Sequence, residues 1–205
     1  VAKPVRTQGN GTREVGKQAP VDANTVFQIA SISKSLSATV AAIEITQRKA
    51  TWDDPASRHL PGFALSNAYV SEHATIGDFF AHRTGLPPTA GDDLEDLGFS
   101  RNDVIARLRL LPLTPFRTSY HYANFSTTIG AEAIARAAGR PWEQLADEQL
   151  FKPLGMASSS YRYADFESHA NRALLHAYQN GHFGRAGKPT ADAQAPGGGG
   201  SSTVG

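Results

Sequence analysis

The chain has 205 residues, 40% hydrophobic and 19% charged, with a formal net charge of +1 at pH 7 and no cysteine. This length and apolar content suit one domain, or one domain plus a fragment, around a buried core. The balanced charge argues against a nucleic-acid partner, and the missing cysteines exclude disulfides, a cysteine nucleophile and thiolate metal sites. No apolar run approaches the roughly 18 residues of a membrane span.

The spacing of apolar residues and the positions of glycine and proline predict a mostly helical chain with little sheet. Residues 1–24 are polar, with at most one short strand, and 51–63 form a proline-punctuated loop. Ser100 and Asp103 suit a capping box. Helices are expected over 31–49, 75–82, 100–111, 126–138 (ended by Gly139) and from Pro141 to about Phe151.

Two features follow the last predicted helix. Alternation over 174–183 with Asn180-Gly181 at its centre predicts a β-hairpin. The closing "APGGGGSSTVG" is interpreted as a flexible loop with no regular element. We therefore expect a polar N-terminal segment (1–24), a helical motif-bearing region (25–190) and a glycine-rich tail (191–205).

The stretch "FQIASISKSLS" places Ser31 at the expected helix start and Lys34 three residues later. Residues three apart share a helix face, so the lysine amine lies beside the serine oxygen and can activate it. Backbone N–H groups at a helix start also favour an oxyanion. The alternative is an ordinary serine N-cap, and Ser-x-x-Lys occurs by chance about once in a chain this long.

A second candidate is "SYHYANFS", in which Tyr122 and Asn124 precede the helix expected over 126–138. A phenolate near cations can act as a general base, and an amide can orient a substrate carbonyl or amide. The alternative is a core tyrosine beside an asparagine cap. Tyr178-Gln179-Asn180 has the same spacing, but the expected Asn-Gly turn explains it.

Six stretches in order together resemble the serine hydrolases of the class C β-lactamase, DD-peptidase and family VIII carboxylesterase superfamily. The family pattern contains a Ser-x-x-Lys helix, a Leu-Pro-x-Phe loop, His-x-Ser-Gly-Leu-Pro, Tyr-x-Asn, Pro-Leu-Gly-Met and a Gly-Gly-x-Ser-Ser segment. The matching stretches are "VFQIASISK" (26–34), "HLPGF" (59–63), "HRTGLP" (82–87), "YANF" (122–125), "KPLGM" (152–156) and "GGGGSS" (197–202).

The resemblance implies an α+β fold, with a helical region and an antiparallel sheet flanked by helices, of which this chain covers mainly the helical part. It implies that Ser31 is the acylated nucleophile, with Lys34 as its partner. Tyr122 would be the base and proton shuttle, with a lowered pKa beside Lys34, and Asn124 would position the substrate. The implied substrate is a small-molecule ester, β-lactam or D-Ala-type peptide, with no metal or organic cofactor required.

The chain departs from the family pattern where a Lys/His-x-Gly motif is expected on a strand after the glycine-rich segment. His182-Phe183-Gly184 matches this motif in sequence but precedes the glycine-rich segment, so we interpret the match as coincidence. We expect the chain to be truncated at both ends, and weakly active or inactive unless a second chain supplies the missing sheet. The alternative is a non-catalytic β-lactamase-like binding or scaffold protein. Export to the periplasm or medium is implied only by the resemblance.

Other polar clusters are interpreted as structural. The seven histidines show no metal-ligand spacing, and His82 and His121 are expected to be hydrogen-bonded structural residues. The acidic run "GDDLEDLG" (91–98) lacks the order of calcium ligands in an EF-hand, so a solvated loop is expected. Trp52 and Trp142 are expected in the core.

Overall fold

The computed structural model describes residues 6–186 and 192–204, as ten α-helices, three 3₁₀- or π-helical turns and four short strands. The first five residues of the predicted polar segment, and the predicted boundary at 190–191, lie outside the described residues. The helices are α1 (Ser33–Thr46), α2 (Ala56–His59), α3 (Ala68–His73), α4 (Ile76–Phe80), α5 (Asp92–Asp96), α6 (Arg101–Arg107), α7 (Asn124–Ala138), α8 (Trp142–Ala146), α9 (Tyr163–Ser168) and α10 (Ala195–Gly198).

The remaining elements are short. Turns of 3₁₀-helix cover Ala30–Ile32 and Leu108–Leu110, and a π-helical turn over Asp147–Phe151 continues α8. The strands are β1 (Phe27–Gln28), β2 (His176–Gln179), β3 (His182–Arg185) and β4 (Ser201–Ser202). They form two antiparallel pairs, β1 with β4 and β2 with β3.

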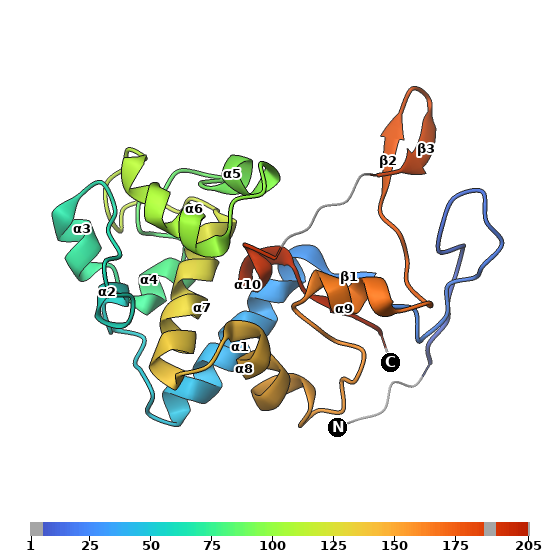
Figure 1. Ribbon diagram of the computed structural model, residues 1–205, viewed down its shortest axis with the longest axis horizontal. Coiled ribbons are helices and arrows are strands. Elements are labelled where there is room, and N and C mark those ends of the chain that lie inside the picture. The colour runs from blue at the N-terminus through green and yellow to red at the C-terminus, as the bar shows by residue number, and fades with distance from the viewer. Residues whose placement is uncertain (1–5, 187–191, 205) are drawn as a thin grey trace.

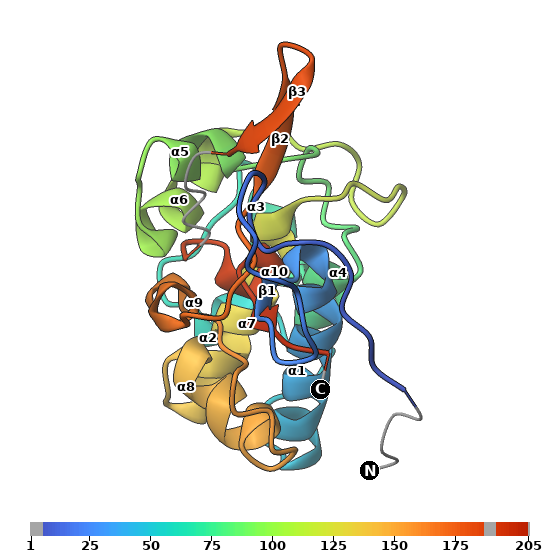
Figure 2. The same ribbon diagram turned by 90° about the vertical axis from the view of Figure 1, so that its right-hand side faces the viewer.

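Helix α7 is the centre of the core, because every residue from Phe125 to Ala135 is buried. Helices α1, α2, α4, α8 and α10 all pack against it, and α1 and α10 lie beside it in both views (Figures 1 and 2). Gly130 lets α4 approach closely, since a Cβ there would lie 2.8 Å from the Phe80 ring. Trp142 is fully buried and Trp52 packs against the core, as predicted.

The predicted long helices are present with shifted ends. The first starts as the 3₁₀ turn, becomes α1 at Ser33 and ends at Thr46, before the predicted residue 49. Helix α7 starts at Asn124 and ends, as predicted, at Gly139 with a φ of 69°. Pro141 is the N-cap of α8, not its first helical residue. One-turn helix α2 lies inside the predicted loop 51–63.

The predicted hairpin is confirmed as β2–β3, with positive φ at both Asn180 and Gly181. It projects away from the helical body (Figure 1). His182-Phe183-Gly184 lies within it, consistent with a coincidental match to the family motif.

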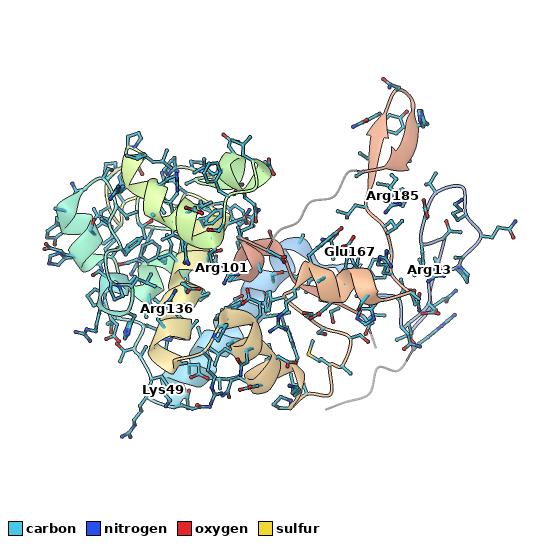
Figure 3. All side chains as sticks on the ribbon, viewed as in Figure 1. Arg13, Lys49, Arg101, Arg136, Glu167 and Arg185 are labelled. Carbon is cyan, nitrogen blue, oxygen red and sulfur yellow. The ribbon has the colours of Figure 1, made fainter. Side chains whose placement is uncertain are left out.

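The prediction of a flexible glycine-rich tail is wrong. Residues 195–198 form α10, Ser201–Ser202 form β4 against β1, and Ala195, Pro196 and Gly197 are buried. Arg101 on α6 fixes the approach to α10: its guanidinium donates to the carbonyls of Ala193 at 3.0 Å and Asp192 at 2.9 Å, and pairs with Glu132 of α7 (Figure 3). Among the described residues, none of the helices is long and apolar enough to cross a bilayer.

Candidate active site

Ser31 lies on an exposed turn between β1 and α1 whose backbone is tightly constrained. The preceding residue, Ala30, has a φ of 45°, a left-handed conformation that is costly for a residue with a side chain. The turn is held from the glycine-rich segment, because the Ile29 N–H donates to the Gly200 carbonyl at 2.9 Å. The Ser31 hydroxyl is therefore presented at a fixed point at the start of a helical segment, while remaining exposed to solvent.

The structure brings the four predicted site residues together. The hydroxyls of Ser31 and Tyr122 share a short hydrogen bond. Lys34 Nζ lies 3.4 Å from Ser31 Oγ, donates to Asn124 Oδ1 at 2.6 Å, and donates to the Gly197 carbonyl of α10. An ammonium group has three N–H donors and no acceptor, so these three oxygens match the hydrogen-bonding capacity of a protonated lysine.

Tyr122 lies between a cation and a buried imidazole. Lys34 Nζ is 4.4 Å from the centroid of the Tyr122 ring, and the His82 ring stacks on the ring with centroids 5.1 Å apart. Burial raises the pKa of Tyr122, but hydrogen bonds from Lys34 and Ser31, and the charge of Lys34, outweigh burial and leave the pKa below its ordinary value. The direction agrees with the sequence-based prediction.

His82 is a structural histidine, as predicted, and only 6% exposed. Its Nδ1 lies 3.4 Å from the Ala123 backbone nitrogen, and its Nε2 lies at the same distance from Thr127 Oγ1. Burial and then the charge of Lys34 lower the pKa of His82 to about 4. The imidazole is therefore neutral near pH 7 and adds no second cation beside Tyr122.

A buried carboxylate fixes the loops that carry His82 and Tyr122. Asp78 on α4 is 0% exposed and accepts from Arg83 at 2.6 Å and from Arg117 at 2.7 Å. Arg83 follows His82 directly, while Arg117 lies in the loop leading to Tyr122. A hydrogen bond of 2.9 Å from the His121 N–H to the His82 carbonyl joins the two loops next to the site. His121 is thus held through its backbone, and its ring contacts Ser119.

Glycines let α10 and β4 approach the site. A Cβ at Gly197 would lie 2.7 Å from the Asn124 carbonyl oxygen, and one at Gly200 would lie 2.7 Å from Ser33 Oγ. Gly198 has no atom within 4 Å of its Cβ position. The glycine-rich sequence therefore has a packing role: it places the Gly197 carbonyl on Lys34.

We expect Gly197→Ala to lower the free energy of unfolding by about 1–3 kcal/mol, because the new methyl group meets fixed backbone at Asn124. Gly198→Ala is the matched control on the same turn, and its added methyl group meets open space. Urea denaturation of both variants measures the difference. Equal midpoints would show that α10 is not pressed against α7 as described.

Sequence reasoning missed two groups near the site, the Gly197 carbonyl and the Asp92 carboxylate. The prediction of a solvated loop over 91–98 is wrong in part: Asp92–Asp96 forms α5 and Glu95 is only 8% exposed, whereas Asp93 and Asp96 are exposed. Glu95 accepts the Gln194 N–H at 2.9 Å, and burial raises the pKa of Glu95 to about 7. The acidic run therefore supports the approach to α10. Over 6–186 and 192–204, no three His, Cys, Asp or Glu side chains gather to hold a metal ion.

Comparisons with known proteins identify the family of the chain. A family profile described as "Beta-lactamase" matches residues 2–205, nearly the whole chain. The chain belongs to the beta-lactamase family. It is thereby a member of the serine hydrolase superfamily of β-lactamases and DD-peptidases, as the ordered motifs predicted.

Similar proteins carry several functional names. Beta-lactamase-like protein 2 of Dictyostelium discoideum is 28% identical over 83% of this chain and 32% of its own length. Esterase EstB of Burkholderia gladioli is 29% identical over 80% of this chain and 45% of its own length. The chain thus spans less than half of the length of these relatives.

A protein of known structure has a similar fold. The octameric penicillin-binding protein homologue from Pyrococcus abyssi superposes with a TM-score of 0.79 at 20% identity, over 95% of this chain and 46% of that chain. The predicted α+β, β-lactamase/DD-peptidase-like fold is confirmed, and the regular secondary structure of the described residues is mainly helical. The family consists of hydrolases.

Proposed function

We propose that the protein is a serine hydrolase that cleaves an ester or amide through an acyl-Ser31 intermediate. The observation that carries the proposal is the hydrogen bond between the exposed Ser31 hydroxyl and the Tyr122 phenol, with Lys34 beside both. A serine hydroxyl is a weak nucleophile near neutral pH and needs a base within hydrogen-bond reach. Tyr122 meets this geometric requirement.

Tyr122 is the better candidate for the base than Lys34. The Lys34 amine donates to Asn124 Oδ1 and to the Gly197 carbonyl, neither of which can donate a proton in return. Lys34 is thus held as a donor, and its positive charge favours the phenolate form of Tyr122. In this scheme the ammonium stabilises the base and the phenolate removes the proton from Ser31.

The proposed reaction has two steps. Tyr122 takes the Ser31 proton as Oγ attacks the substrate carbonyl carbon, and the Ser31 backbone N–H faces the resulting oxyanion. The intermediate collapses when Tyr122 gives its proton to the leaving oxygen or nitrogen, which leaves acyl-Ser31. A water molecule, activated by Tyr122, then hydrolyses the acyl-enzyme, and Asn124 positions the acyl group through its amide.

Turnover of an unactivated substrate depends strongly on each hydrogen-bond donor that stabilises the oxyanion. Removing one such donor typically reduces turnover about 10²- to 10³-fold. Acylation of Ser31 by an activated reagent depends less on that donor than turnover of an unactivated substrate does. Labelling is therefore the more sensitive assay.

Hydrolysis of a short-chain nitrophenyl ester and of nitrocefin, compared on the same preparation, tests the proposal and its substrate class. We expect the ester to be hydrolysed faster, because the similar protein EstB is an esterase and an aryl ester is the more reactive acyl donor. Faster nitrocefin turnover would assign a β-lactam substrate instead. No hydrolysis and no serine labelling would favour a non-catalytic binding or scaffold protein.

A further inference from the structure

Asp92 is the first residue of α5, and backbone hydrogen bonds connect its surroundings to the segment that carries Tyr122. The Asp92 N–H donates to the Thr89 carbonyl at 3.0 Å, and the Thr89 N–H donates to the Tyr122 carbonyl at 3.2 Å. Gly91 is pressed onto Phe125, since a Cβ there would lie 2.7 Å from the ring. These contacts hold Asp92 next to Asn124.

Asp92 is half-buried, and one oxygen of its carboxylate is closed off from solvent. Its Oδ1 is buried and has no hydrogen-bond partner. The Asn124 side chain and the charge of Lys34 both act on the carboxylate and oppose the effect of burial on its pKa. An unpartnered buried carboxylate oxygen is unfavourable by itself, and the favourable position of an acid in the first turn of a helix typically offsets only part of that cost.

The Asn124 amide links Asp92 to Lys34. Asn124 Oδ1 accepts from Lys34 Nζ at 2.6 Å, which turns the Nδ2 donors of the same amide away from the lysine. A carboxylate accepts hydrogen bonds and cannot donate one when ionised. Asp92 therefore favours the amide orientation in which Nδ2 faces the carboxylate and Oδ1 faces Lys34.

We propose that Asp92 is a positioning residue of the Ser31 site, whose carboxylate fixes the Asn124 amide and offsets part of the Lys34 charge at Tyr122. The expected effect of Asp92 on catalysis rests on the function proposed above. The carboxylate does not contact Ser31, so Asp92 acts through Asn124, Lys34 and Tyr122.

The charged and titratable groups that face Tyr122 fix the direction of the electrostatic effect. They are Lys34 from α1, His82 from the turn after α4, and Asp92 from α5, with the Ser31 hydroxyl in hydrogen-bond contact. His82 is neutral near pH 7, so Lys34 and Asp92 carry the opposing charges. The charge of Asp92 raises the pKa of Tyr122, and removing it moves that pKa further down.

Asp92 also has a stability signature that separates a positioning role from a structural one. Burial raises the pKa of Asp92, against the lowering effects of Asn124 and Lys34. An acid whose pKa is raised by folding is less favourable ionised in the folded protein than in the unfolded chain. Asp92→Asn is therefore expected to leave the melting temperature unchanged or higher.

The test compares Asp92→Asn with Asp96→Asn, which removes the same charge from an exposed position on α5. The first readout is the pH titration of the Tyr122 Cζ resonance in ¹³C-tyrosine-labelled protein, assigned by its absence from Tyr122→Phe. This readout requires no catalysis. The second readout is the rate of fluorophosphonate labelling as a function of pH.

Asp92→Asn is expected to lower the pKa of Tyr122, to move the rising limb of labelling to lower pH, and to slow labelling at its plateau about tenfold. Asp96→Asn is expected to change none of these. An unchanged Tyr122 titration, or an Asp92→Asn protein that no longer folds, would overturn the inference. A shifted titration in a protein whose wild type does not label would sink the proposed function and leave the assignment of Asp92 intact.

Discussion

Replacing Ser31 by alanine is expected to reduce nitrophenyl ester hydrolysis by about 10⁴-fold, because no acyl-enzyme can then form. Tyr122 and Lys34 would remain, but a base without its nucleophile can only assist water. The measurement is the steady-state rate at fixed pH, with chain concentration verified by absorbance.

Ser35→Ala is the matched control, because Ser35 lies one turn along the same helical segment and is exposed. Its activity should equal that of the unaltered chain. Hydrolysis that survives Ser31→Ala undiminished would rule out an acyl-Ser31 intermediate.

Tyr122→Phe is expected to slow acylation by about 10²- to 10⁴-fold, the range typical of losing a general base. The substitution removes only the hydroxyl that contacts Ser31, while the ring remains available to stack on His82 and to face Lys34. Stability should therefore change little. Tyr120→Phe is the control, because it removes the hydroxyl of a tyrosine that lies two residues before Tyr122 and is 65% exposed.

The pH dependence of acylation is expected to follow the ionisation of the Tyr122 phenol. The pKa of Tyr122 lies below its ordinary value of 10.0, so the phenolate population, and with it the rate, rises as pH increases through that lowered pKa. Tyr122→Phe should lose this rising limb, whereas Tyr120→Phe should keep it. A limb that persists in Tyr122→Phe would assign the base to another residue.

The sequence was sufficient to predict the residues that come together at the site. Ser31 and Lys34 are neighbours through local helical geometry, and the Tyr-x-Asn segment was placed beside them by the order of the motifs. The geometry of the turn could not be predicted: Ala30 adopts a positive φ because Ile29 is bonded to Gly200, a contact 171 residues away. Long-range pairing of this kind leaves no local pattern.

Amino-acid composition gave predictions for two segments, the glycine-rich tail and the acidic run 91–98, that the structure corrects. Four consecutive glycines are typical of a flexible loop, but here two of them are required by packing, because Gly197 and Gly200 press against Asn124 and Ser33. The acids of 91–98 predicted solvent exposure, and Asp93 and Asp96 are exposed, but Glu95 on the same helix is buried. Asp92 has no periodic relation to Asn124, so only the fold could bring the two together.

The most direct test of the central claim is the intact mass of the chain after fluorophosphonate treatment, with Ser31→Ala treated in parallel. We predict one adduct on the unaltered chain and none on the variant, since the Ser31 hydroxyl contacts the Tyr122 phenol and has the Lys34 amine beside it. An adduct of equal yield on Ser31→Ala, or a folded, unaltered chain that remains unmodified, would contradict an activated serine at position 31.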